Sequence, residues 1–169
     1  MNTFTWRDHP VWLRNLAPQL DAQPETPEQA ARMEIDHFIR LHRTKGGIRL
    51  ETDEALGEGY VITQQNEDRV VRGGKTGILY GTYALLLGMS GSACVHRDEA
   101  DPEETGTTAG ICRPYYGLRM LDCWDNMDGS IERGYAGRSL WFEDNVFHYA
   151  PDRIRQLGRM LASVGCAVS

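Results

Sequence analysis

The sequence lacks the features that mark several large classes of protein. No apolar run approaches the roughly 20 residues of a membrane-spanning helix. The opening residues, MNTFTWRDHPVWLRN, contain no apolar core of the kind that a signal peptide requires. Only 18 Lys and Arg are present in 169 residues, they are scattered, and the net charge is −6. Because phosphate binding needs clustered basic residues, we expect no nucleic acid as a partner. The missing apolar run leads us to expect no membrane partner, and the missing signal peptide leads us to expect a cytoplasmic location.

Cysteine is also scarce. The four cysteines, Cys94, Cys112, Cys123 and Cys166, lie far apart and form neither a CxxC pair nor a Cys/His ligand spacing. The sequence therefore favours unpaired thiols in a reducing compartment over disulfides or a zinc site. We expect no metal and no cofactor.

Two short motifs resemble ligand-binding loops but lack residues that such loops require. Gly73–Thr76 (GGKT) looks like the end of a phosphate-binding loop, yet Arg69 stands where that loop needs another Gly. Asp125–Gly129 (DNMDG) resembles part of a calcium loop. Alignment on its glycine places Trp124 and Tyr135 where the first Asp and the bidentate Glu belong. We therefore interpret the first motif as a tight turn into a helix and reject a calcium loop.

The first half of the chain has the element order of a small α/β layer. Thr26, Pro27 and Gln29 form a capping box with Pro at the first helical position, and the helix that they start is expected to end by Gly46. The order helix, strands, helix favours the α/β class. The pattern predicts strands at Ile48–Glu51, Tyr60–Gln64 and Arg69–Arg72, a turn centred on Asn66, Glu67 and Asp68, and a buried helix over Thr76–Met89.

An acidic, turn-rich stretch from Asp98 to Gly110 (DEADPEETGTTAG) divides the chain. Such a composition cannot bury enough apolar surface to order itself, so we expect a linker or long surface loop there. The expected organisation is an amino-terminal α/β domain over 1–97, a linker over 98–112 and a second domain over 113–169. In the second domain, Gly117–Asp122 is strand-like and Tyr149–Val164 has apolar residues at helical spacing.

Functional side chains are densest in Leu121–Trp141 (LDCWDNMDGSIERGYAGRSLW), directly after that expected strand. An aromatic ring can stack on the apolar face of a pyranose, Asp and Asn can bind its hydroxyls, and Arg can bind a sugar carboxylate. Trp124, Asp125 and Asn126 follow the strand's C-terminal end, where a (β/α) barrel builds its site. In the alternative, this is a structural loop whose tryptophans pack, whose Arg133 pairs with an acid and whose glycines permit turns. Composition leaves both interpretations open.

This run resembles the signature of the glycoside hydrolase family 67 α-glucuronidases, in which a barrel strand leads into H-W-D-N-x-D-G-x-I-E-R-G-Y-A-G. VWLRN near the N-terminus, EGYVI at Glu58–Ile62 and TGILYGTYALL at Thr76–Leu86 resemble the amino-terminal α/β domain of that family, and RMLASVG at Arg159–Gly165 its first barrel helix. Cys123 stands where the family has His, and Cys166–Ser169 replaces the usual run into the second strand. The matching positions are Trp124, Asp125, Asn126, Asp128, Gly129, Glu132, Arg133, Gly134, Tyr135, Ala136 and Gly137.

The resemblance implies an inverting enzyme that releases glucuronic or 4-O-methylglucuronic acid, α-1,2-linked to the terminal xylose of xylo-oligosaccharides. It implies no metal, and a homodimer for the full-length enzyme. Trp124 matches the family's substrate-stacking tryptophan, and Asp125, Asn126, Glu132 and Arg133 complete the implied substrate-binding set. Inversion needs a carboxylic acid and a carboxylate base roughly 6.5–9.5 Å apart. In the family these belong to later barrel strands, so no catalytic residue is expected in this chain.

A (β/α)₈ barrel takes roughly 250 residues, whereas about 57 follow the expected linker here, from Arg113 to Ser169. We therefore expect an amino-terminal fragment: a small amino-terminal α/β sandwich domain, followed by the first β/α unit of a truncated (β/α)₈ barrel. The alternative is a stand-alone, non-catalytic carbohydrate-binding or interaction domain. The two hypotheses differ in whether the reading frame continues past Ser169 into further β/α units.

Overall fold

The computed structural model describes residues 22–90, 110–148 and 150–166. The chain divides into two compact units, Met1–Tyr115 and Tyr116–Ser169. Within the described part of the chain, no helix combines the length and the apolar character needed to cross a membrane.

Two sequence predictions fall largely on residues outside the described ranges. The VWLRN motif lies in the segment 1–21, and most of the predicted linker over 98–112 lies in the segment 91–109. The last linker residue, Cys112, exchanges two backbone hydrogen bonds of 2.9 Å with Tyr60 at the edge of the first unit's sheet. The division into 1–97, 98–112 and 113–169 stays a prediction.

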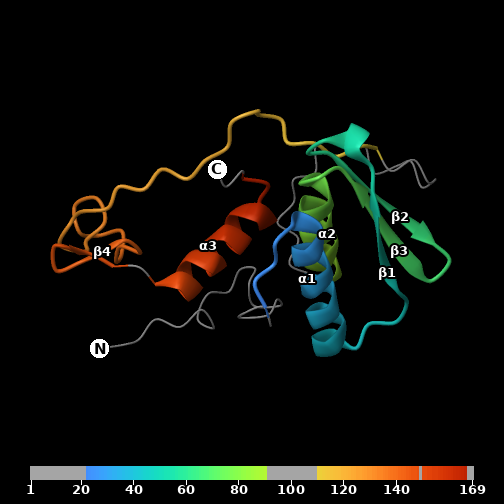
Figure 1. The fold of residues 1–169 in the computed structure, drawn as a ribbon, viewed down its shortest axis with the longest axis horizontal. Coiled ribbons are helices and arrows are strands. Elements are labelled where there is room, and N and C mark those ends of the chain that lie inside the picture. The colour runs from blue at the N-terminus through green and yellow to red at the C-terminus, as the bar shows by residue number, and fades with distance from the viewer. Residues whose placement is uncertain (1–21, 91–109, 149, 167–169) are drawn as a thin grey trace. The chain divides into compact units, whose positions relative to one another are not determined.

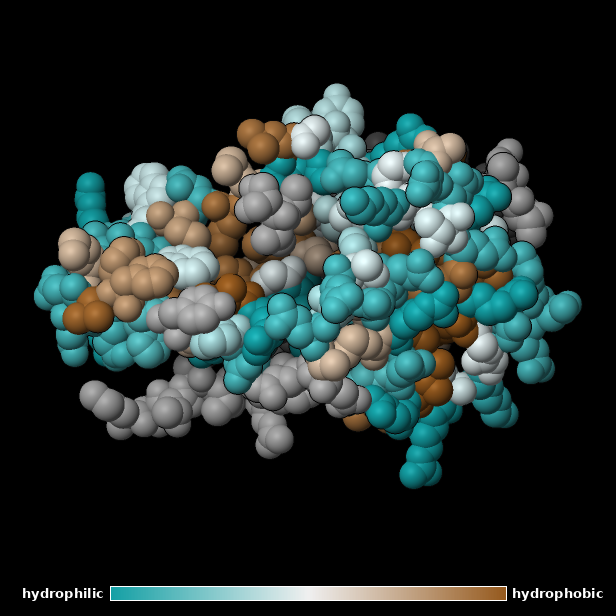
Figure 2. All heavy atoms as spheres, in the orientation of Figure 1, coloured by the Kyte–Doolittle hydropathy of each residue, from teal (hydrophilic) through white to brown (hydrophobic). Residues whose placement is uncertain are grey.

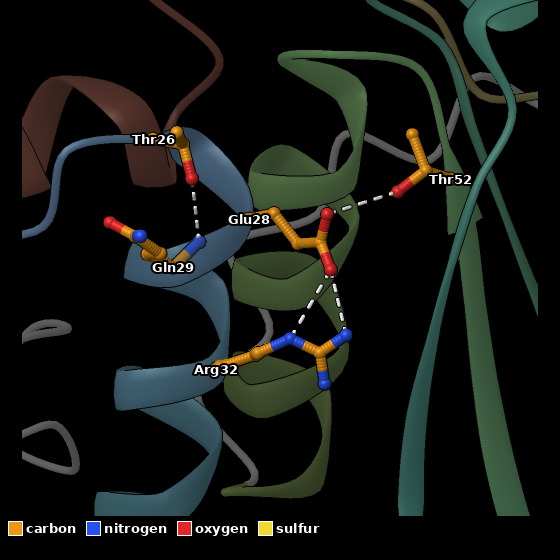
Figure 3. A network of polar contacts seen from close by, with 5 residues as sticks. All are labelled: Thr26, Glu28, Gln29, Arg32 and Thr52. Atoms are coloured by element: carbon orange, nitrogen blue, oxygen red, sulfur yellow. Dashed lines mark hydrogen bonds and ion pairs between the residues drawn. The ribbon is translucent and has the colours of Figure 1, made fainter.

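The first helix, α1 (Pro27–His42), begins at the capping box that the sequence predicts. Thr26 is extended, and its hydroxyl accepts a hydrogen bond of 3.1 Å from the Gln29 backbone N–H (Figure 3). The Gln29 side chain accepts from the backbone N–H of Glu25, one position before the usual capping-box partner. The helix ends at Arg43, which adopts the left-handed conformation at φ 48° and donates to the Ile39 carbonyl.

The sheet of the first unit has three strands in the order β1-β3-β2, and all three were predicted. The central strand β3 (Asp68–Gly73) pairs in parallel with β1 (Ile48–Thr52) and antiparallel with β2 (Tyr60–Gln65). Between β1 and β2 lies a single 3₁₀ turn, η3 (Glu54–Leu56). The β2–β3 hairpin turns at Asn66, whose φ of 57° suits a residue type that tolerates the left-handed region. The mixed helix and strand content confirms the α/β class.

Helix α2 (Gly77–Met89) lies beside α1 and next to the sheet, as Figure 1 shows. Its buried residues form a core with α1 and the sheet; the largest side chains of this core are Tyr83, Phe38, Ile78, Leu86, Val70 and Val71. The buried Glu34 of α1 accepts a hydrogen bond of 2.7 Å from the Tyr83 hydroxyl, which links the two helices. On the surface, Arg32 and Thr52 both donate to the Glu28 carboxylate, and Arg32 contributes most to lowering the pKa of Glu28 (Figure 3).

Glycines allow the backbone to cross closely where β3 meets α2. A Cβ at Gly74 would lie 2.0 Å from the Gly57 carbonyl oxygen, and one at Gly77 would lie 2.0 Å from that of Gly59. No side chain fits at either point, because real Cβ atoms do not approach a backbone oxygen so closely. The Gly73–Thr76 motif is thus a tight turn into a helix, as predicted.

The second unit contains a short hairpin and a helix. Strands β4 (Phe142–Glu143) and β5 (Val146–Phe147) pair antiparallel across the turn residues Asp144 and Asn145, whose φ values are 49° and 65°. Positive φ at both central residues is the geometry of a tight two-residue hairpin. The helix α3 (Pro151–Ser163) confirms the helix predicted over 149–164, and none of its residues is buried.

The predicted strand at Gly117–Asp122 is wrong, because these residues form no strand in the structure. Leu118 and Met120 are exposed by 76% and 67%. A strand needs a hydrogen-bonded neighbour, and the described residues of this unit offer none to this segment. Arg119 instead ties the segment to the end of α3, because its guanidinium donates to the carbonyls of Tyr116 and Gly165. Figure 2 shows apolar residues, coloured brown, at the surface of the second unit.

Candidate functional site

The loop from Trp124 to Arg138 folds back on itself through backbone hydrogen bonds. The Glu132 N–H donates to the Trp124 carbonyl over 2.8 Å, and the Asn126 N–H donates to the Ser130 carbonyl over 2.8 Å. Antiparallel bridges join Asp125 to Ile131, and Ser130 to Arg138. Residues that are eight positions apart in sequence, Trp124 and Glu132, therefore lie next to each other.

Two polar side chains hold this loop closed from within. The Asn126 amide donates to Ser130 Oγ over 2.9 Å and to the Glu132 carbonyl over 2.7 Å. Asp128 Oδ1 accepts from the Ser130 backbone N–H over 2.9 Å and from its hydroxyl over 2.6 Å. These bonds, led by that of the hydroxyl, lower the pKa of Asp128, and the charge of Arg138 adds to the effect. Loss of the Asp128 charge on acidification, at a pH below its usual pKa, would weaken the loop.

Glycine and left-handed backbone set the path of the loop. Gly129 has φ 87°, and a Cβ there would lie 2.9 Å from the Phe142 carbonyl oxygen. Glu132 adopts φ 53°, a conformation that residues other than glycine seldom take and that is enriched at functional sites. The loop is also fastened to the β4–β5 turn, where the Asn145 N–H donates to the Met127 carbonyl over 2.7 Å.

The loop brings Trp124, Asp125, Asn126 and Glu132 together, and three of the five predicted site residues, Trp124, Asn126 and Arg133, are exposed at its surface. Trp124 is 62% exposed, and its indole N–H donates to the Asp122 carboxylate over 2.6 Å. Asp125 and Glu132 are half-buried on paired stretches of the loop. Arg133, next to Glu132, is exposed and makes no ion pair with the described residues.

Some residues of the motif fit the interpretation as a structural loop, and others fit the interpretation as a sugar-binding loop. Asn126, Asp128 and the glycines behave as a structural loop would, because their polar groups and conformations are used inside it. Trp124 and Arg133 do not, because the indole ring is exposed and the guanidinium pairs with no acid among the described residues, whereas the structural interpretation expects such a pair. An exposed aromatic ring and an exposed cation on a fixed loop can bind an acidic sugar.

Two residues of the site escaped the sequence analysis. Asp122 was assigned to a strand, and its bond to Trp124 appears only in the structure. Tyr135 lies within the matched run, and a hydrogen bond with the Glu132 carboxylate raises the pKa of its phenol. The described residues include no cluster of three or more His, Cys, Asp or Glu side chains that could hold a metal ion. Cys112 and Cys123 are exposed free thiols.

Comparison with known proteins decides what this loop is related to. Residues 100–168 match the family model described as the glycosyl hydrolase family 67 middle domain. Residues 100–168 therefore belong to glycosyl hydrolase family 67. The resemblance read from the Trp124–Gly137 run is thereby confirmed.

Curated relatives carry α-glucuronidase names. A probable alpha-glucuronidase A of Aspergillus fumigatus is 51% identical over 51 residues, which are 30% of this chain and 6% of that protein. The protein of the same name from Aspergillus oryzae is 36% identical over 110 residues, 65% of this chain and 11% of the relative. That of Aspergillus terreus is 32% identical over 130 residues, 77% of this chain and 14% of the relative. The chain thus matches only a small part of these relatives' length, and the longest of these alignments extends upstream of residue 100 into the first unit.

Proposed function

We propose that this chain is the amino-terminal part of an inverting α-1,2-glucuronidase that releases glucuronic or 4-O-methylglucuronic acid from xylo-oligosaccharides. The observation that carries the proposal is the folded Trp124–Gly137 loop, which keeps an aromatic ring and a guanidinium exposed while Asn126, Asp128 and Ser130 bond to one another within it. The family membership of residues 100–168 supports the same assignment. A truncated barrel after the first unit, a cytoplasmic location and a homodimer of the full-length enzyme stay predictions.

Each residue of the proposed pocket has a different part in binding. The exposed Trp124 ring stacks on the apolar face of the sugar, and Arg133 binds its carboxylate through two parallel hydrogen bonds. Asp125 and Glu132 accept hydrogen bonds from hydroxyls. Asn126 contributes less than the sequence suggests, because both of its amide hydrogens are already donated within the loop and only its oxygen is left to accept.

The hydrolytic step needs groups that these residues do not supply. Inversion uses one carboxylic acid to protonate the leaving oxygen and one carboxylate to activate water, roughly 6.5–9.5 Å apart. The family resemblance assigns both to later strands of the barrel. The present residues would bind and orient the sugar so that those carboxylates act on it.

We expect residues 1–169 on their own to hydrolyse nothing. The purified polypeptide, incubated with an aldouronic oligosaccharide, should release no glucuronic acid above the rate without protein, because the acid and the base are absent. The complete gene product serves as the positive control under the same conditions. Release of glucuronic acid by the 169-residue polypeptide would show that the catalytic carboxylates have been assigned to the wrong part of the protein.

A further inference from the structure

Trp124 has an unusual combination of exposure and orientation. Its side chain is 62% exposed, so packing against neighbours does little to hold the ring. Its indole N–H nevertheless donates a 2.6 Å hydrogen bond to Asp122 Oδ2. Among the described residues this carboxylate is the polar partner of the ring, and it lies two positions earlier in the chain.

The Asp122 carboxylate at the edge of the ring restricts the orientation of the Trp124 indole, which the few packing contacts of an exposed ring would leave variable. An indole has one donor, at the edge of the ring plane, so a bond there directs the ring while leaving both faces open. A bond to an ionised acceptor is also stronger than one between neutral groups. An aromatic ring that is held before the sugar arrives loses less conformational freedom on stacking, which favours binding.

We infer that Asp122 is a positioning residue for the sugar subsite, because its carboxylate holds the Trp124 indole in the orientation that stacks on the substrate. This inference rests on the proposed function, in which Trp124 contacts the sugar. Asp122 itself need not touch the substrate. It acts through the ring, so its removal matters only while Trp124 carries its N–H.

The test is a double-mutant cycle in the complete gene product, with KM and kcat measured on an aldouronic oligosaccharide. Asp122→Leu, which keeps the approximate size and removes the acceptor, should raise KM roughly three- to tenfold with kcat unchanged, the range expected for one hydrogen bond. Asp122→Asn retains an acceptor oxygen and should stay within about twofold of the wild type. Asp152→Leu changes an exposed aspartate of the same unit that pairs with Arg155 instead, and should leave KM unchanged.

The decisive arm combines Asp122→Leu with Trp124→Phe, which keeps a ring and removes the donor. If Asp122 acts through the indole, Asp122→Leu should not change KM further in a protein that already carries Trp124→Phe. If Asp122 has a general structural role, Asp122→Leu should raise KM both in that variant and in the wild type. An unchanged KM for Asp122→Leu, together with a raised KM for Trp124→Ala, would overturn the inference and leave the proposed pocket standing. An unchanged KM for Trp124→Ala would instead contradict the pocket itself.

Discussion

Replacement of Trp124 by alanine should reduce kcat/KM of the complete gene product on an aldouronic oligosaccharide by roughly 30-fold or more. A buried stacking contact with an aromatic ring is commonly worth about 2 kcal/mol or more when truncated, and about 1.4 kcal/mol corresponds to tenfold. The exposed ring makes few contacts within its own unit, so the loss should appear in substrate binding and not in folding. Steady-state kinetics and the thermal midpoint of the variant separate the two.

Met127 offers a matched control on the same loop. It is a large apolar residue that is 58% exposed, and its backbone carbonyl, not its side chain, fastens the loop to the β4–β5 turn. Met127→Ala should therefore keep kcat/KM within about twofold of the wild type, because its exposed side chain makes none of the proposed contacts with the sugar. Equal losses for the Met127 and Trp124 variants would mean that the loop responds to truncation in general and that the ring has no specific part in binding.

Replacement of Gly77 by alanine should destabilise the first unit by about 3 kcal/mol or more, because overpacking against fixed backbone cannot relax without moving a strand or helix. The added Cβ would lie 2.0 Å from the Gly59 carbonyl oxygen and 2.7 Å from the Gly59 carbonyl carbon. Both are backbone atoms in the turn that leads into β2. Urea unfolding of the 169-residue chain, followed by circular dichroism, measures the change in the free energy of unfolding.

Gly88 provides the opposite case on the same helix. It is exposed near the end of α2, and a Cβ there meets nothing within 4 Å. Gly88→Ala should leave stability unchanged or raise it by up to about 1 kcal/mol, because alanine favours the helix over glycine. If Gly77→Ala were as well tolerated as Gly88→Ala, this result would contradict the close approach between the backbone of α2 at Gly77 and the Gly59 carbonyl before β2.

The first unit could be predicted closely because its signals are local. The Thr26 cap, the Asn66 turn and the apolar helix after Gly74 each depend on neighbours within a few residues. The strands also pair within a short span, with β2 and β3 joined by a two-residue turn. The parallel pairing of β1 with β3 could not be derived, because nothing in the residues themselves selects it over an antiparallel partner.

The second unit shows where local signals fail. Gly117–Asp122 has the composition of a strand, but a strand depends on hydrogen-bonded neighbours from elsewhere in the chain. The β4–β5 hairpin was missed although its signal was present, since Asp144 and Asn145 both tolerate positive φ and stand between Phe142–Glu143 and Val146–Phe147, each of which carries an aromatic residue.

The motif residues themselves were identified from the sequence, but their division of labour was not. Composition does not show that the Asn126 amide donates its hydrogen bonds within the loop, or that the Asp128 carboxylate accepts hydrogen bonds from Ser130. It also cannot tell that Asp122 faces the indole of Trp124. These contacts depend on how the loop folds back between Trp124 and Glu132. Backbone hydrogen bonds determine that fold, and the identities of the side chains do not reveal them.

In the proposed function, the Trp124–Gly137 loop forms a wall of a glucuronate pocket. A crystal structure of the complete gene product with glucuronic acid bound tests it most directly. We predict that the pyranose ring stacks on the Trp124 indole and that the sugar carboxylate accepts hydrogen bonds from Arg133. Density for glucuronic acid at a site that contacts neither residue would show that this loop is not part of the sugar pocket.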